Sequence, residues 1–138
     1  MKTRLLTALL TLCLVLSLTP ISATTVFAAN ATTVTNETEL TTALDNADYT
    51  EIKLGNNIET TAKLNVKRTV TLDLNGYTLS CSSTDEDIFL VRSSGNLTVK
   101  DSGTSGKIDG QNKNCGFDVT EGTLTLESGS IVNCTDAD

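Results

Sequence analysis

The chain has 138 residues, of which 10 are Lys or Arg, 17 are Asp or Glu and none is His, and its net charge is −7. This length allows one domain, and the acidic balance argues against nucleic acid or an anionic membrane as a partner. Because the chain has no histidine and no cysteines at CxxC spacing, we expect no zinc site.

Residues 1–29 have the pattern of a secretory signal peptide. Lys2 and Arg4 precede a short apolar run and then a stretch of small residues, which is the usual order of such signals. The run is shorter than the roughly 20 apolar residues of a membrane span. We expect cleavage after Ala28 or Ala31. Cleavage would leave a secreted chain without a membrane-spanning segment and would change the net charge from −7 to −9, because two basic residues and no acidic ones are lost.

Residues 30–48 are predicted to form an N-terminal segment with a short capping helix. Asn36 can cap the helix start, and Glu39 stands three positions later, which is a capping-box arrangement. Apolar residues then recur on one helix face. We expect this helix to cover the first apolar side chains of the following repeats and to shield their unpaired strand edges. The apolar face consists of Leu40, Ala43, Leu44 and Ala47.

Residues 49–138 combine short alternating apolar stretches with turns rich in Gly and Asn, which predicts short β-strands. Three similar stretches are centred on Thr71, Thr98 and Thr125, each 27 positions after the one before. A constant spacing of strand motifs is typical of a solenoid.

Two further strand families lie between these stretches, so each repeat has three strands. The pattern predicts an all-β fold, a three-sided parallel β-helix of about three to four repeats. An antiparallel sandwich with hairpin turns at Asn75-Gly76 and Glu121-Gly122 is the alternative, but hairpins do not explain the constant spacing. One family comprises residues 64–66, 89–91 and 117–119, and the other comprises 52–54, 77–79, 107–109 and 130–132.

Stacked repeats place equivalent side chains in columns. We predict an inward apolar column, an outward threonine column of β-branched residues, and an outward charged column of alternating sign. These columns are Leu72, Val99 and Leu126; Thr71, Thr98 and Thr125; and Asp73, Lys100 and Glu127.

No capping segment is apparent at the other end of the predicted stack. The sequence stops at Asp138, soon after the strand at residues 130–132. We therefore expect the repeats to be truncated there, with either further β-helix repeats or another chain at the C-terminal edge.

The repeats resemble those of bacterial secreted or cell-surface proteins with pectate-lyase-like repeats. The similar runs are residues 70–79, 95–102 and 122–131, and the resemblance extends from about residue 33 to the end. It implies a right-handed parallel β-helix in an extracellular setting. Such repeats occur both in adhesin-like proteins and in polysaccharide enzymes, so the fold alone does not imply a function.

The resemblance also implies which clusters an enzyme of this group would need. Lyases of the group hold calcium with stacked carboxylates, and hydrolases use clustered aspartates. Here Lys100 is expected above Asp73, and Asp118 shares a column without other carboxylates. Arg68 and Arg92 are expected to be solvated turn residues. We therefore assign no catalytic residue.

Calcium is the one cofactor that the sequence raises. Asp85, Glu86 and Asp87 form the densest acidic patch, and calcium prefers several oxygen ligands. We favour a solvated corner loop at these residues and keep them as weak calcium candidates.

Three cysteines remain after signal cleavage. Exported proteins can form disulfides, and a disulfide is possible among Cys81, Cys115 and Cys134. An odd number leaves at least one thiol unpaired within the chain.

Taken together, these features predict a non-catalytic extracellular β-helix module of a bacterial surface protein. It would be adhesin-like or a stalk, with host or cell-surface glycans or proteins as partners. The alternative is the N-terminal part of a polysaccharide lyase or glycoside hydrolase of the pectate-lyase-like group.

Overall fold

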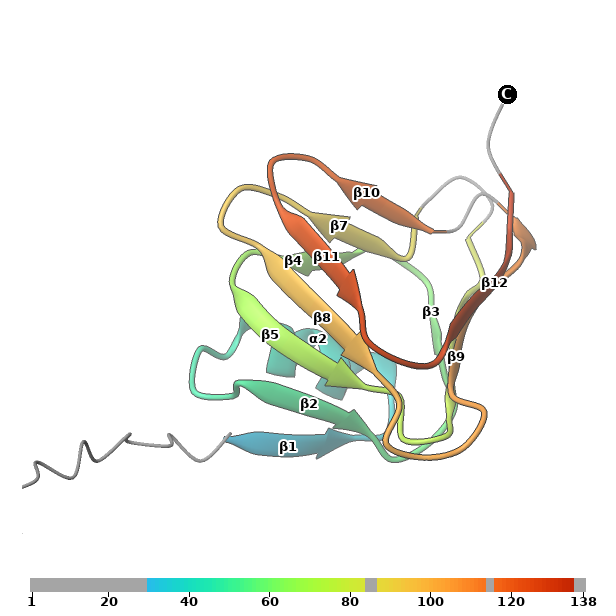
Figure 1. The fold of residues 1–138 in the computed structure, drawn as a ribbon, viewed down its shortest axis with the longest axis horizontal. Coiled ribbons are helices and arrows are strands. Elements are labelled where there is room, and N and C mark those ends of the chain that lie inside the picture. The colour runs from blue at the N-terminus through green and yellow to red at the C-terminus, as the bar shows by residue number, and fades with distance from the viewer. Residues whose placement is uncertain (1–29, 84–86, 114–115, 136–138) are drawn as a thin grey trace, which may run out of the picture.

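The computed structural model describes residues 30–83, 87–113 and 116–135, and the predicted signal peptide lies outside them. The described residues form mostly β-strands, with one helix near the N-terminal end (Figure 1). The elements are β1 (Ala31–Val34), α2 (Glu37–Asp45), β2 (Glu51–Leu54), β3 (Ile58–Thr60), β4 (Leu64–Val66), β5 (Thr69–Asp73), β6 (Thr78–Cys81), β7 (Phe89–Val91), β8 (Asn96–Lys100), β9 (Lys107–Lys113), β10 (Phe117–Val119), β11 (Thr123–Leu126) and β12 (Ser130–Cys134).

The strands belong to three sheets that the chain visits in a fixed order. Sheet A has the order β1-β2-β5-β8-β11, sheet B the order β12-β9-β6-β3, and sheet C the order β10-β7-β4. From β2 onward the chain passes from sheet A to B to C and then back to A, and we call each such passage a repeat. Figure 1 shows the strands of sheet A side by side. Every strand pair recorded is parallel, whereas the hairpins of the alternative sandwich would be antiparallel.

The register within sheet A repeats every 27 residues from β5 to β11. Leu72 lies opposite Val99, and Val99 lies opposite Leu126. Leu72 and Val99 are fully buried, whereas Leu126 is 44% exposed because β11 is the last strand of its sheet. The neighbouring column contains Thr71, Thr98 and Thr125.

The predicted family of residues 77–79, 107–109 and 130–132 forms sheet B as β6, β9 and β12, but the placement of residues 52–54 in that family is wrong. The structure places β2 in sheet A, with Ile52 opposite Leu72. In sheet B, β3 takes the expected position, with Ile58 opposite Leu79. Only 20 positions separate Ile52 from Leu72, so the first repeat is shorter than the later ones and a constant spacing misaligns it.

Helix α2 begins at the predicted cap. The Asn36 side chain accepts a hydrogen bond from the Glu39 amide at 3.0 Å. The Glu39 carboxylate, in turn, accepts from the Thr35 amide at 2.7 Å rather than from the cap residue as in a standard capping box. The helix ends at Asp45, so the predicted place of Ala47 on the buried face is wrong, and Ala47 is exposed.

Arg68 holds the C-terminal end of this helix, so the predicted solvated role of Arg68 is wrong. The last carbonyls of a helix have no intrahelical partner, and the guanidinium supplies donors for them. Arg68 donates to the carbonyls of Ala43 at 2.8 Å, Leu44 at 2.9 Å and Tyr49 at 2.6 Å.

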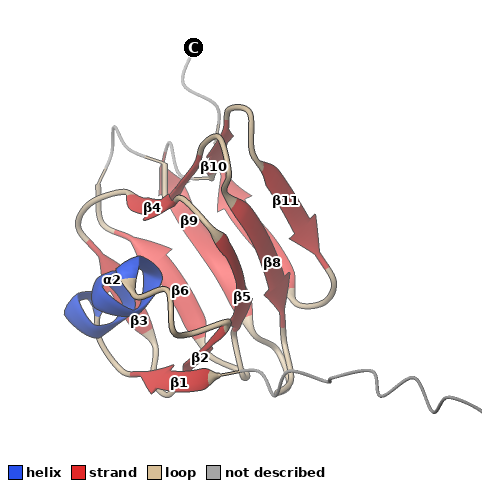
Figure 2. Ribbon diagram, turned by 90° about the vertical axis from the view of Figure 1, so that its left-hand side faces the viewer, coloured by secondary structure: helices blue, strands red, loops and turns tan. Residues whose placement is uncertain are grey.

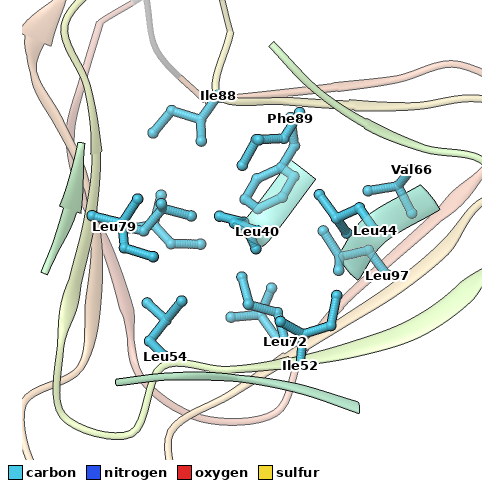
Figure 3. Packing of buried hydrophobic residues seen from close by; sticks show 14 of the residues in the cluster. Leu40, Leu44, Ile52, Leu54, Val66, Leu72, Leu79, Ile88, Phe89 and Leu97 are labelled. Atoms are coloured by element: carbon cyan, nitrogen blue, oxygen red, sulfur yellow. The ribbon is translucent and has the colours of Figure 1, made fainter. Parts of the chain in front are cut away.

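The hydrophobic core lies inside the three sheets and beneath the helix (Figure 3). Leu40 and Leu44 from α2 meet apolar side chains from all three sheets, and α2 lies at the end of the stack that carries β1 (Figure 2). Burial of these side chains is the main term that favours folding. The largest fully buried side chains include Ile52, Leu54, Leu64, Leu72, Leu74, Leu79, Ile88, Phe89, Leu97 and Ile108.

The strand β1 was not anticipated from the sequence. It pairs with β2, and the preceding Asn30 carbonyl accepts from the Thr50 amide at 3.0 Å. Signal cleavage after Ala28 would leave these pairings whole, whereas cleavage after Ala31 would remove Asn30 and the first residue of β1.

Candidate functional site

Asp73 lies at the corner where the chain leaves sheet A for sheet B. The register places it in the predicted outward charged column opposite Lys100, but the residue is only 1% exposed. Its carboxylate accepts from the amides of Asn75 and Ser102, each at 2.9 Å. Burial raises the pKa of this carboxyl, but the hydrogen bonds from Ser102 and Asn75 and the charge of Lys53 outweigh it and lower the pKa.

The charged column pairs differently from the prediction. The register does set Asp73 opposite Lys100, but the ion pairs join Lys53 to Asp73 at 3.6 Å and Lys100 to Glu51 at 3.0 Å. The lysines of both pairs are partly exposed, which limits what the pairs contribute to stability.

Asp101 occupies the same corner one repeat later. Its carboxylate accepts from the amides of Gly76 at 2.7 Å, Gly103 at 3.1 Å and Gly106 at 2.8 Å. A Cβ on Gly103 would lie 2.4 Å from the backbone of Asn75, so the two turns touch directly. Both corner carboxylates therefore bind backbone amides of stacked turns, which leaves them poorly suited to act as a general base or a metal ligand.

A second polar cluster lies on the outer face of sheet B. The Asp109 carboxylate accepts from Lys107 Nζ at 2.8 Å, from Asn133 Nδ2 at 2.9 Å and from the Gln111 amide at 3.0 Å. These hydrogen bonds, with Lys107 the largest contribution, lower the pKa of Asp109 to about 2. A carboxylate held ionised in this way anchors the 107–113 strand and is a weak proton acceptor.

The weak calcium candidates are only partly described. Asp85 and Glu86 lie outside the described residues, and Asp87 faces Lys63 at 4.0 Å. In the part of the chain that the structure describes, no group of three or more His, Cys, Asp or Glu side chains is placed to hold a metal ion. The calcium site stays a prediction.

Cys81 is buried in β6 and Cys134 is exposed in β12, and both are free thiols in the structure. Cys115 lies outside the described residues, so a disulfide that includes it stays a prediction. Although Cys134 is largely exposed, partial desolvation of its thiol, together with the nearby charges of Asp109 and Asp87, raises the pKa of Cys134 despite the Gly110 backbone hydrogen bond. The Cys134 thiol is therefore protonated at neutral pH and is a poor nucleophile.

A pocket of about 240 Å³ lies between the edge strand β1 and helix α2. The sequence analysis did not predict this pocket, because it did not predict β1. The feature of the pocket that is visible in the sequence is the pair Thr38 and Thr42, four positions apart on the predicted helix. The wall of the pocket is mostly apolar but rich in threonine, with one aromatic residue, Tyr49. We call it the β1–α2 pocket, and it is lined by Thr32, Thr33, Val34, Thr38, Glu39, Thr42, Ala43 and Tyr49.

The opposite end of the stack is formed by β10, β11 and β12, the last strands of their sheets. Among the described residues, the large hydrophobic side chains that are exposed all lie on these strands: Val119 at 41%, Leu126 at 44% and Ile131 at 36%. Their counterparts in the repeat below, Val91, Val99 and Ile108, are fully buried.

Comparison with known proteins gives one family. Residues 31–135 match the family model described as "Putative pectate lyase-like adhesive domain". Neither a curated protein sequence nor a solved structure gives a significant match to the chain. In the described residues no helix is long and apolar enough to cross a membrane. Since the family model covers most of the chain, from β1 to the end of β12, the chain belongs to the pectate lyase-like adhesive domain family.

Proposed function

We propose that this chain is a non-catalytic extracellular module of a bacterial surface protein. The module folds as a right-handed, three-sided parallel β-helix with α2 as its N-terminal cap, and it acts in adhesion or as a stalk. The observation that carries the proposal is the family match over residues 31–135, a family whose description names an adhesive domain.

The strand order supports the β-helix. Each sheet gains one strand per repeat, and each new strand pairs in parallel with the strand one repeat earlier. Parallel neighbours require a crossover connection, and here the other two sheets supply it. In a sheet, right-handed crossovers are strongly preferred, which supports a right-handed coil.

The surroundings of the acidic side chains support a binding role over catalysis. Asp73, Asp101 and Asp109 each direct their oxygens to backbone amides or to a lysine and an asparagine. A polysaccharide hydrolase needs two carboxyl groups that flank a bond, and these three groups are occupied in stabilising turns and strands. The alternative, an N-terminal part of a lyase or hydrolase, is kept because the family description also contains the words "pectate lyase-like".

The test uses the secreted, processed chain in two assays. We expect it to bind cells, matrix proteins or immobilised glycans in a pull-down assay. We also expect no rise in ultraviolet absorbance when it is incubated with polygalacturonate and calcium. Unsaturated products in the second assay would establish the lyase alternative, and a lack of binding to every surface would leave only the stalk.

A further inference from the structure

We propose that the β1–α2 pocket binds a single neutral sugar residue. In this site Tyr49 packs against the sugar ring, while threonine hydroxyls, the Glu39 carboxylate and the free edge of β1 hydrogen-bond the sugar hydroxyls. The inference rests on the proposed adhesive function, because it names the ligand class and the place on the module where recognition occurs.

The size of the pocket sets the size of the ligand. Pockets for drug-sized ligands typically enclose roughly 300–1,000 Å³, and the β1–α2 pocket encloses about 240 Å³. It therefore suits one ring rather than an oligosaccharide, although its open side would let a longer glycan continue into solvent. The pocket is lined by residues of β1 and α2, and both elements lie at the N-terminal end of the stack (Figure 2).

The aromatic wall is held in position by the fold. Tyr49 is half-buried and packs against the hydrophobic core, and its carbonyl accepts from Arg68 at 2.6 Å. Val34 and Ala43 supply the rest of the apolar wall and are themselves buried. An aromatic ring with a fixed backbone offers a flat apolar surface at low entropic cost, and the C–H face of a sugar ring is a suitable partner for it.

The polar wall offers both donors and acceptors, as a ligand with several hydroxyls requires. The Thr42 hydroxyl donates to the Thr38 carbonyl at 2.7 Å, so its oxygen still has lone pairs to accept a ligand hydroxyl. Thr32 and Thr38 bring two more hydroxyls to the wall.

The backbone of β1 adds a further donor and acceptor. β1 is the terminal strand of sheet A, and the carbonyls of Asn30 and Val34 accept from the β2 side. In a parallel strand, the backbone N–H and C=O groups of one residue point to one neighbouring strand and those of the next residue point to the other side. The amide and carbonyl of Thr33 therefore face the free edge of β1, and Thr33 lines the pocket.

The charge around the pocket selects against anionic sugars. Glu39 lines it, and the hydrogen bonds from Thr35 lower the pKa of this carboxyl, so it is ionised at neutral pH. Glu37 adds a second acidic group to the first turn of α2, and the Arg68 guanidinium beside the last turn is occupied by the carbonyls of Ala43, Leu44 and Tyr49. A uronate, the sugar of pectate, would meet like charges, whereas a neutral hexose would use Glu39 as an acceptor.

A pair of neighbouring threonines on α2 allows a matched test. Thr41 and Thr42 are both exposed, but only Thr42 lines the pocket, so Thr42→Arg should fill it while Thr41→Arg leaves it open. Amide chemical shifts of the processed chain are followed by NMR during titration with methyl glucoside, methyl galactoside, N-acetylglucosamine and sodium galacturonate. We expect at least one neutral sugar to shift amides of β1 and residues 38–43, with affinity reduced at least tenfold by Thr42→Arg and changed less than twofold by Thr41→Arg.

Several results would overturn the proposal. These are the absence of shifts at the pocket with any neutral sugar, equal binding by the Thr42→Arg chain, or binding of galacturonate as tight as that of the neutral sugars. The unliganded spectra of both variants show directly that they are folded. If adhesion is unchanged in Thr42→Arg, the proposal that the β1–α2 pocket is the recognition site fails, whereas the proposed adhesive function is retained. Sugar binding that Thr42→Arg abolishes, in a chain that adheres to no surface, would support the pocket and remove the adhesive function.

Discussion

Asp109 lies on the outer face of sheet B, where Lys107, Asn133 and the Gln111 amide surround its carboxylate. It connects β9 with β12, strands from successive repeats. The corner residues Asp73 and Asp101 do the same between successive turns. At the scale of single residues, these three aspartates therefore join one repeat to the next.

The depressed pKa of Asp109 predicts a pH dependence of stability. Its pKa is about 2 in the folded chain and 3.8 in the reference state, so the unfolded chain takes up the proton first as the pH falls. The stabilisation is therefore complete above about pH 4 and is lost as the pH falls to about 2. We expect Asp109→Asn to have a lower denaturation midpoint than the unmodified chain at pH 7, and the difference to shrink between pH 4 and 2. Urea denaturation across this range measures it, and a difference that stays constant down to pH 2 would contradict the assignment.

Helix α2 is the element whose position depends most on individual polar contacts. At its first turn the Glu37 carboxylate accepts from the Thr61 amide at 2.7 Å, and at its last turn Arg68 binds the carbonyls of Ala43 and Leu44. The donors come from the loops after β3 and β4. Because these contacts join segments about 24 residues apart, the helix is fixed to the first repeat and the β1–α2 pocket is fixed with it.

Removal of the Arg68 guanidinium should loosen this attachment. We expect Arg68→Gln to lower the free energy of unfolding by about 2–3 kcal/mol, because carbonyls that accept from a charged donor lose their partner in a partly buried site. Lys67→Gln is the matched control, since Lys67 is the exposed neighbour in the same turn, and it should change the value by less than about 0.5 kcal/mol. If both changes lower the free energy of unfolding equally in guanidinium chloride denaturation, the Arg68 hydrogen bonds do not hold the helix in solution.

At the scale of the whole molecule, the two ends of the stack differ. One end carries α2 and β1 (Figures 1 and 2). At the other end, the outermost described strands of the three sheets expose the apolar side chains of Val119, Leu126 and Ile131. The stability of a stacked array is the sum of its repeats and of the contacts between neighbours. The same side chain should therefore contribute less in the final repeat than in an inner one.

Two leucines of a single column test this difference. Leu72 is 0% exposed and Leu126 is 44% exposed. We expect Leu72→Ala to lower the free energy of unfolding by about 2–5 kcal/mol, since it leaves a cavity in a packed interior. Leu126→Ala should cost less than about 1 kcal/mol, because little buried surface is lost. Chemical denaturation of both variants measures the two changes in the free energy of unfolding. If Leu126→Ala lowers it nearly as much as Leu72→Ala does, this end is covered in solution.

The positions of sheet C and of most of sheets A and B could be predicted from the sequence. Side chains in strands alternate with period two, and stacked repeats of equal length repeat that alternation at one spacing, as Thr71, Thr98 and Thr125 do. The start of helix α2 could also be predicted, because its cap depends on a contact between Asn36 and the Glu39 amide, which are only three positions apart. These features depend on neighbours in the chain or on a constant period, and both are visible in the sequence.

The remaining features were decided by tertiary structure. The first repeat is shorter than the others, so the place of β2 beside β5 depended on strand pairing that no constant period reveals. Arg68 and Asp73 act on groups about 20 to 30 positions away, and the β1–α2 pocket needs a strand and a helix that meet only after folding. The sequence by itself determined the local alternation, the cap and the period. Which side chains reach across from one repeat to another was decided only when the repeats stacked, because such contacts depend on distance in space and not on separation along the chain.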